Sequence, residues 1–270
     1  MNRTTTFRAL TIGISLFILF SCEDIINIEL HSVKPQIVIE GIVRMGAFPT
    51  VRVSTTQDFN SINEYPSIKD AVVEIWDDAG NREILPFNVD SDKYVVTDAA
   101  LIGGIKRKTY NLSVTCQGKE YLAESTMLPL VKIDSLTLSK LTLLDYPCPM
   151  IHFTSPIGMK KGGYKCTISI NDKILTNDTF ISADYLAGKP IHLILPIFFE
   201  EKEDRRNTPI QQGDNITVEM QCLDADLYKF FWSLGRTNNR MANPVNNIQG
   251  GALGYFGAYS WTQKKVTVEL

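Results

Sequence analysis

The stretch Lys108–Thr126, KTYNLSVTCQGKEYLAEST, decides the fold of this chain. In its first half every second residue is apolar or Cys, namely Tyr110, Leu112, Val114 and Cys116. A period of two is that of a β-strand with one buried and one solvated face. Gln117-Gly118-Lys119 then supplies turn residues before a second strand-like run, Glu120–Thr126. The stretch therefore predicts a β-hairpin.

The same period recurs before this hairpin. Strands are predicted at 36–44, 50–55, 71–76, 82–87 and 93–97, with turn clusters such as Asp77-Asp78-Ala79-Gly80-Asn81 between them. About seven short strands in roughly 100 residues are typical of a β-sandwich. We expect an immunoglobulin-like or prealbumin-like sandwich over residues 35–128.

Strand-like segments continue beyond Met127–Ser135, a proline-bearing segment that we interpret as a domain boundary. Further strands are predicted at 136–144, 150–154, 164–170, 191–197, 215–222 and 265–270. They predict a second β-sandwich over residues 129–270, so the fold class is all-β. Asn243–Ser260 is rich in glycine, but it lacks the lysine and the helix of a phosphate loop. Its glycines are expected to mark bulges or tight corners.

One segment, Asp224–Leu234, departs from the strand pattern. Its apolar residues have helical spacing: Leu227, Phe230, Phe231 and Leu234. Asp224 is suited to cap the start of a helix, and Gly235 is suited to end it. We predict an amphipathic helix at 224–234 whose apolar stripe covers an open end or face of the second sandwich.

Beyond residue 22 the chain has four cysteines: Cys116, Cys148, Cys166 and Cys222. All except Cys148 share the parity of apolar strand residues, where a free cysteine packs as a small hydrophobe. We favour buried thiols, and the alternative is a disulfide, with Cys148–Cys166 as the pair. No Cys-x-x-Cys occurs, and the three histidines, His31, His152 and His192, are far apart in the sequence. We therefore expect no metal site and no cofactor.

The N-terminus has the pattern of an export signal. Arg3 and Arg8 precede an apolar run, Ala9–Phe20, that is too short to span a bilayer as a helix. Ser21 then precedes Cys22, as at sites where lipoprotein signal peptidases cut before an acylated cysteine. We expect a signal peptide at 1–21, lipidation of Cys22, palmitate included, and a tether at 22–34. The alternative is an ordinary secretory signal with a chance cysteine.

Charge and motifs indicate no further chemistry. The chain has 27 Lys and Arg against 30 Asp and Glu, without a basic block, so no nucleic-acid partner is expected. No Gly-x-Ser-x-Gly occurs. The paired acids lie in predicted turns, a charged loop and the helix cap: Asp77/Asp78, Glu200/Glu201 and Asp224/Asp226. We expect no enzyme activity, and the alternative is a hydrolase with two carboxylates across a cleft.

Several segments resemble a known family in their order along the chain. They are Cys22–Asp24, Ile28–Leu30, Pro35–Gly41, Asp70–Ile75, Tyr110–Val114, Ile133–Leu136, Tyr228–Phe231, Asn247–Gly251 and Phe256–Ser260. The chain resembles the lipoproteins grouped as domain of unknown function 4249. The resemblance implies a lipoprotein of Bacteroidota, often found beside TonB-dependent outer-membrane receptors, in a family without an established activity. Glu23 and Asp24 resemble the acidic signal that sends such lipoproteins to the cell surface.

The leading hypothesis is a non-enzymatic outer-membrane lipoprotein, anchored in the bilayer by its acyl chains and exposed at the cell surface. It would be an accessory or ligand-capturing partner of a TonB-dependent transporter. Its contact surface is expected on the helix and the glycine-rich loop, at Tyr228, Trp232, Tyr255 and Tyr259. The alternative is a surface glycan-binding or adhesion module with an aromatic platform at Trp76, Trp232 and Trp261.

Overall fold

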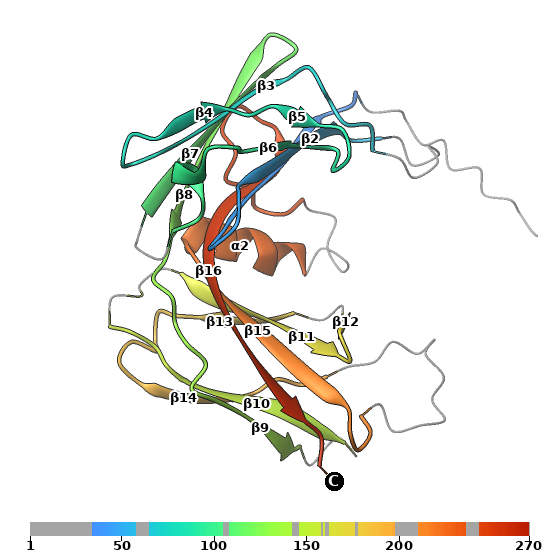
Figure 1. Ribbon diagram of the computed structural model, residues 1–270, viewed down its shortest axis with the longest axis vertical. Coiled ribbons are helices and arrows are strands. Elements are labelled where there is room, and N and C mark those ends of the chain that lie inside the picture. Colours follow the sequence, from blue (N-terminus) through green and yellow to red (C-terminus); the bar gives the residue numbers. More distant parts are fainter. Residues whose placement is uncertain are drawn as a thin grey trace, which may run out of the picture. The chain divides into compact units, whose positions relative to one another are not determined.

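The computed structural model describes residues 34–57, 65–104, 108–141, 146–157, 159, 162–175, 178–197, 210–235 and 243–269. Apart from Lys34, these residues belong to one compact unit, Pro35–Gln57 with Ser61–Leu270. Strands dominate them, and α2 (Ala225–Leu234) is the only α-helix in this part of the chain (Figure 1). The all-β class with one amphipathic helix is thereby confirmed.

Two sheets pack face to face around the first core. One contains, in order, β16 (Leu253–Thr267), β1 (Ile37–Arg44), β2 (Thr50–Thr55), β6 (Lys93–Val95) and β5 (Phe87–Asn88). The other contains β4 (Arg82–Ile84), β3 (Val72–Asp77), β7 (Lys108–Cys116) and β8 (Lys119–Met127). A short 3₁₀ helix, η1 (Ala99–Leu101), precedes β7. Side chains from both sheets, such as Ile39, Val73 and Leu112, are fully buried between them.

The predicted hairpin is β7–β8. Cys116 pairs with Lys119, so Gln117 and Gly118 are the two central residues of the turn. Both have positive φ, 51° and 74°, which is the signature of the type I′ turn that matches the twist of a hairpin. Every second residue of β7 from Tyr110 to Cys116 is buried, as the alternation predicted.

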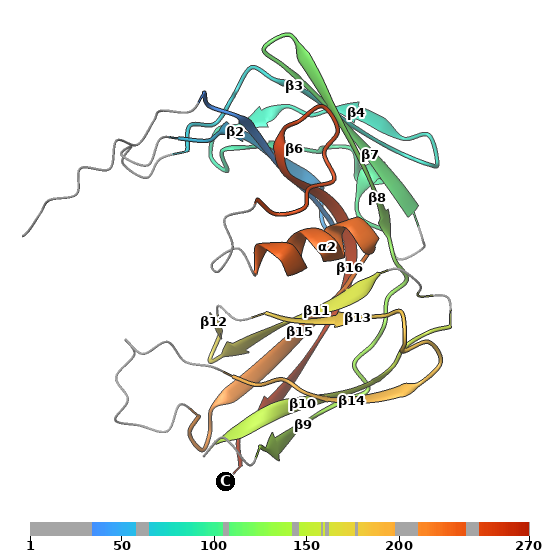
Figure 2. The ribbon, with the colours of Figure 1, turned by 180° about the vertical axis from the view of Figure 1, so that it is seen from behind.

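The second core lies between two further groups of strands (Figure 2). One group continues from β16 through β15 (Asn215–Leu223), β11 (Gly163–Ile170) and β12 (Lys173–Ile174), and β13 (Thr179–Ser182) also pairs with β11. The other is the three-stranded sheet of β14 (Pro190–Ile194), β10 (Pro147–Thr154) and β9 (Ser135–Lys140). Along the chain, the boundary between the two cores falls after Met127. Met127 is buried in the first core and Leu128 in the second.

Strand β16 is shared by both cores. Its residues 253–259 pair in parallel with β1, and its residues 260–267 pair antiparallel with β15. The prediction of a final strand limited to 265–270 is therefore wrong, because the strand begins at Leu253. Glycines allow its first half: a Cβ on Gly254 would lie 2.0 Å from the Ile39 carbonyl oxygen, and φ there is +102°. Only glycine suits such a close backbone approach at that φ.

Helix α2 begins as predicted. The Asp224 side chain accepts a hydrogen bond from the Leu227 amide at 2.9 Å, which is N-capping. Leu227 and Phe230 are buried, whereas Leu234 remains 44% exposed. Of the two predicted placements, an open end or a face of the second sandwich, the contacts of α2 with β11 and β15 bear out the face. Its buried side joins an apolar cluster with Leu223 and residues of β1 and β16 on a sheet face, where Gly257 makes room for Leu227.

Candidate functional site

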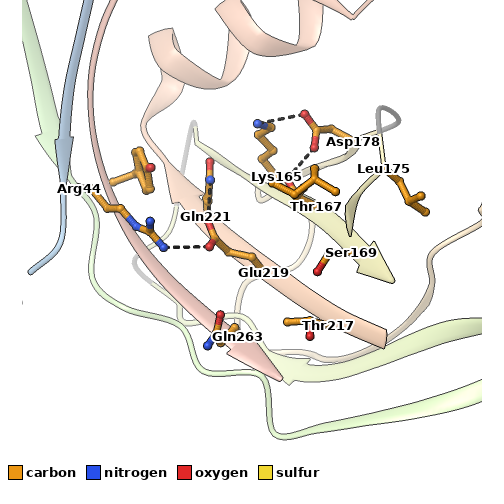
Figure 3. Close-up of a pocket in the computed structure, with 12 residues that line it drawn as sticks. Arg44, Lys165, Thr167, Ser169, Leu175, Asp178, Thr217, Glu219, Gln221 and Gln263 are labelled. Carbon is orange, nitrogen blue, oxygen red and sulfur yellow. Dashed lines mark hydrogen bonds and ion pairs between the residues drawn. The ribbon is translucent and has the colours of Figure 1, made fainter. Parts of the chain in front are cut away.

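A polar pocket of about 440 Å³ lies on the β11–β15–β16 sheet, on the face turned away from the second core (Figure 3). Side chains of β11, β15 and β16 form its floor. Arg44, at the end of β1, lies at one side, and Leu175 and Asp178 lie at the other. A volume of this size is within the usual range for small-molecule sites, about 300–1,000 Å³.

Strand alternation places the polar floor. In β15, Ile216, Val218 and Met220 are fully buried in the second core. The residues between them therefore point to the opposite face, and these are the pocket residues Thr217, Glu219 and Gln221. The same alternation in β11 brings Lys165, Thr167 and Ser169 to the pocket.

One ion pair joins β1 to β15 in this pocket. Parallel pairing with β16 places Arg44 opposite Tyr259, and its Nη2 donates to Glu219 Oε2 at 2.9 Å. Gln221 Nε2 donates to the other oxygen of Glu219 at 2.8 Å. The guanidinium carbon also lies 3.9 Å from the centre of the Trp261 ring, a cation–π arrangement. Contacts on two sides thus fix Arg44 and Glu219.

A second ion pair joins β11 to the segment before β13. Lys165 Nζ lies 3.0 Å from Asp178 Oδ2, and Thr167 Oγ1 donates to Asp178 Oδ1 at 2.6 Å. Lys165 Nζ also lies 4.7 Å from the centre of the Phe231 ring of α2. The Lys165 side chain is only 15% exposed. The lysine is therefore held by the helix and by the segment that carries Asp178.

The pocket combines balanced charge with free hydrogen-bonding groups. Its two cations and two carboxylates cancel, so it presents no net charge to a ligand. Three further lining side chains, Ser169, Thr217 and Gln263, hydrogen-bond no other described residue. Burial raises the pKa of Tyr259, opposed by the Arg44 guanidinium and reinforced by the Glu219 carboxylate. The Tyr259 hydroxyl therefore stays protonated at neutral pH.

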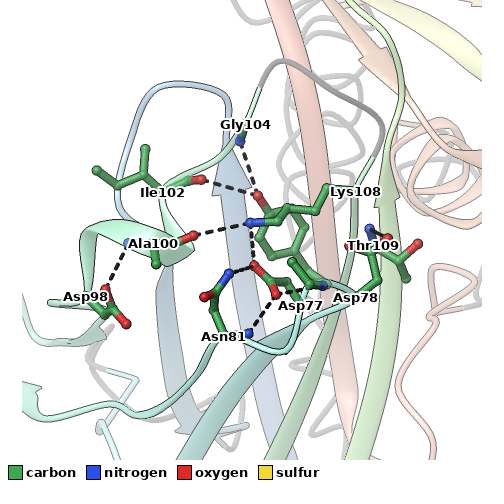
Figure 4. Close-up of polar contacts among 11 residues, drawn as sticks. Asp77, Asp78, Asn81, Asp98, Ala100, Ile102, Gly104, Lys108 and Thr109 are labelled. Atoms are coloured by element: carbon green, nitrogen blue, oxygen red, sulfur yellow. Dashed lines mark hydrogen bonds and ion pairs between the residues drawn. The ribbon is translucent and has the colours of Figure 1, made fainter.

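A separate polar cluster in the first sandwich is structural (Figure 4). Asp77, 3% exposed, accepts hydrogen bonds from the amides of Ala79 and Asn81, each at 3.0 Å, and from Asn81 Nδ2 at 2.8 Å. It also forms an ion pair with Lys108, whose Nζ donates to the Ala100 carbonyl at 3.2 Å. The cluster ties the β3–β4 turn to β7 and η1.

Three of the four residues predicted for a contact surface pack in the apolar cluster between α2 and the sheet. Tyr228, Tyr255 and Tyr259 belong to the apolar cluster of Leu223 and Leu227, and Tyr259 is only 9% exposed. The Tyr255 ring lies 4.6 Å from that of Phe230. Trp232, at 40%, is the exposed member of the predicted set. Cys22, Glu23 and Asp24 lie outside the described residues.

The predicted tryptophan platform is divided among three elements. Trp76 is on β3, Trp232 on α2 and Trp261 on β16. Arg82 lies over the Trp76 ring at 5.0 Å, and Arg44 covers Trp261, whose Nε1 donates to the Met45 carbonyl at 3.1 Å. Each of these two rings therefore has one face covered by an arginine.

The four described cysteines, Cys116, Cys148, Cys166 and Cys222, are free and buried. The interpretation as buried thiols is confirmed for these residues, and the disulfide between Cys148 and Cys166 does not form. No helix in the described ranges is both long and apolar enough to cross a membrane.

Most pocket residues were not predicted as a site. Lys165 and Glu219 are far apart in the sequence, and the β11–β15 register brings them to one face. Asp178 joins them from the segment before β13. The sequence signal for the pocket was the alternation of polar residues along β11 and β15. A strand face that is simply exposed to solvent has the same alternation, so the signal did not identify a site.

The comparisons with known proteins bear on the family alone. A family model described as "Domain of unknown function (DUF4249)" matches residues 23–265. The chain belongs to this family. No curated protein matches this family member at a significant level. Among solved structures, the chicken interferon gamma receptor alpha chain is similar over 88% of this chain and 100% of its own, at 9% identity and a TM-score of 0.25. A likeness that low carries no argument.

Proposed function

We propose that this DUF4249 member is a non-enzymatic, lipid-anchored outer-membrane protein that captures a neutral, hydroxyl-rich small molecule and works beside a TonB-dependent transporter. The observation that carries the proposal is the charge-balanced polar pocket. Because its cations and carboxylates are paired with one another, a charged ligand gains little there. A neutral ligand with several hydroxyl groups gains hydrogen bonds to Ser169, Thr217 and Gln263.

The two carboxylates of the pocket also support ligand binding rather than catalysis. Glu219 and Asp178, its two carboxylates, are each held by a cation and by a side-chain donor. Fixed side chains reduce the entropy lost on binding. A hydrolase instead requires a carboxylic acid free to transfer a proton to the leaving group.

The proposed lipid anchor and the proposed exposure at the cell surface both rest on the N-terminal sequence. Cys22→Ser is expected to abolish labelling with a palmitate analogue and to prevent stable attachment to the membrane. Cys116→Ala, at a buried strand position, is the matched cysteine control and should leave labelling unchanged. Glu23→Ala with Asp24→Ala is expected to remove sensitivity to external protease, and Glu29→Ala is its control. Unchanged labelling of C22S would contradict the anchor.

The transporter partnership is tested by mild solubilisation of the native membrane and affinity purification. Wild-type protein is expected to bring down a TonB-dependent transporter. Trp232→Ala should reduce its recovery, because an exposed tryptophan is a typical interface anchor. Leu234→Ala on the same helix, at similar exposure, is the control. Recovery of the wild-type protein alone would count against the partnership.

Trp232 is also what supports the alternative, a glycan-binding or adhesion module. Its exposure is the remaining basis for an aromatic contact. Retention on immobilised surface polysaccharide that is lost in Trp232→Ala, but kept when Ser169→Tyr fills the pocket, would favour this alternative over ligand capture.

A further inference from the structure

Two histidines that are far apart in the sequence face each other on the three-stranded sheet. His152 of β10 and His192 of β14 are direct partners in the antiparallel register. Their neighbours Ile151 and Phe153 are buried in the second core. The histidines therefore lie on the opposite, outward face of the sheet, where His152 is half-buried and His192 is exposed.

The two rings converge through the same type of nitrogen. The Nδ1 atoms are 2.5 Å apart, and the ring centres are 4.8 Å apart. On the far side of His152, Nε2 lies 2.9 Å from Thr137 Oγ1. Thr137 Oγ1 donates its one proton to the Met150 carbonyl, at 3.5 Å. The contact with Thr137 occupies Nε2 of His152, so Nδ1 is the ring nitrogen directed at His192.

We propose that His152 and His192 bind one divalent transition-metal ion through their Nδ1 atoms, with Thr137 as a positioning residue. Neutral imidazole is a common ligand for Cu²⁺, Ni²⁺ and Zn²⁺. A hydrogen bond at the other ring nitrogen is the usual way in which a ligating histidine is held in the required tautomer.

A modest movement opens the pair to a metal. Metal–nitrogen bonds of 2.0–2.1 Å at a tetrahedral angle require the two nitrogens to be about 3.3 Å apart. The exposed His192 ring can make this adjustment by turning about its side-chain bonds, while Thr137 holds His152. The proton that joins the two Nδ1 atoms leaves to solvent when the metal binds, or moves through solvent to Nε2 of the same ring.

The ligand set also defines which ions bind. Among the described residues no third His, Cys, Asp or Glu completes a cluster, so water fills the remaining positions and the ion exchanges readily. Cu²⁺ should bind more tightly than Ni²⁺ or Zn²⁺. Ca²⁺ and Mg²⁺ should not bind, because they require several oxygen ligands.

The test is Cu²⁺ and Zn²⁺ binding to the purified full chain by titration calorimetry, with electron paramagnetic resonance of the Cu²⁺ form. We expect one ion per chain and a spectrum with two imidazole nitrogens. His152→Gln and His192→Gln should each weaken binding at least about tenfold and leave one nitrogen in the spectrum. His31→Gln, which removes the third histidine, should change neither result. Thr137→Val should weaken binding by about tenfold while retaining both nitrogens.

Thermal unfolding without metal checks that the variants fold, and added Zn²⁺ should raise Tm only in chains with both histidines. The proposal is overturned if wild-type protein binds neither ion. It is equally overturned if H152Q and H192Q bind as wild type does, or if H31Q alone removes the signal.

Discussion

Asp77→Asn is expected to lower the free energy of unfolding by about 3 kcal/mol. The Asp77 side chain has no exposed surface, and the Lys108 side chain beside it is 18% exposed. The substitution removes the carboxylate charge but keeps the shape, so Lys108 faces an amide in place of its counterion. Removing one member of a buried ion pair costs about 3–5 kcal/mol. Lys108 keeps its bond to the Ala100 carbonyl, which places the loss near the lower end.

The same argument fixes the pH dependence. Burial alone would raise the pKa of Asp77, but hydrogen bonds from Asn81 and Lys108 outweigh it and hold the pKa below its ordinary value of 3.8. The folded state therefore favours ionised Asp77. The resulting stabilisation is complete above pH 3.8 and is lost as the pH falls through the folded-state pKa. The difference between wild type and D77N should shrink in acid.

Urea unfolding followed by circular dichroism measures both effects. Asp78→Asn is the matched control, since Asp78 is exposed and accepts a hydrogen bond from the Thr109 amide at 3.1 Å. It should cost less than about 1 kcal/mol. Lys108→Met completes a double-mutant cycle and should show a favourable coupling energy with Asp77. A D77N protein as stable as D78N, or a loss of the same size at pH 7 and pH 2.5, would refute the reasoning.

Three further predictions follow from buried contacts. Asp224→Ala should lower the free energy of unfolding by about 2–4 kcal/mol in the same urea assay, because it removes the cap of α2 and orphans the donors at Ser125 and Thr126; a loss below 1 kcal/mol would contradict this. Gly257→Ala should cost about 1–3 kcal/mol, since its Cβ would lie 2.4 Å from Leu227; unchanged stability would mean that α2 packs elsewhere. Burial raises the pKa of the Cys166 and Cys222 thiols, so iodoacetamide should modify them only in urea. Mass spectrometry measures the labelling, and rapid labelling of the native protein would show that these thiols are not buried.

Local patterns predicted the parts of the fold that depend on local periodicity. The alternation in β7 and β15 predicted both the strands and their buried faces, because one sheet face must meet a core. The Asp224 cap and the apolar spacing after it predicted α2 to within one residue. The extent of β16 was missed because glycine and asparagine resemble loop residues unless a neighbouring backbone requires them.

The sites depend on register, which no local pattern contains. Arg44 and Glu219 meet because β1 and β15 both pair with β16. His152 and His192 meet because the antiparallel register of β10 and β14 places them directly opposite each other. A register shift of one residue would point one ring into the core. The sequence spacing of the histidines led to the expectation of no metal site, and the proposed two-histidine site rests on the strand register instead.

The central claim is that the pocket captures a neutral, hydroxyl-rich molecule. Native mass spectrometry of protein purified gently from the outer membrane tests it most directly, with Ser169→Tyr to fill the pocket and Ser135→Tyr, at an exposed position of β9, as the control. We predict that wild type and S135Y carry the same small neutral adduct and that S169Y lacks it. An adduct retained in S169Y, or absent from the wild type, would contradict the account.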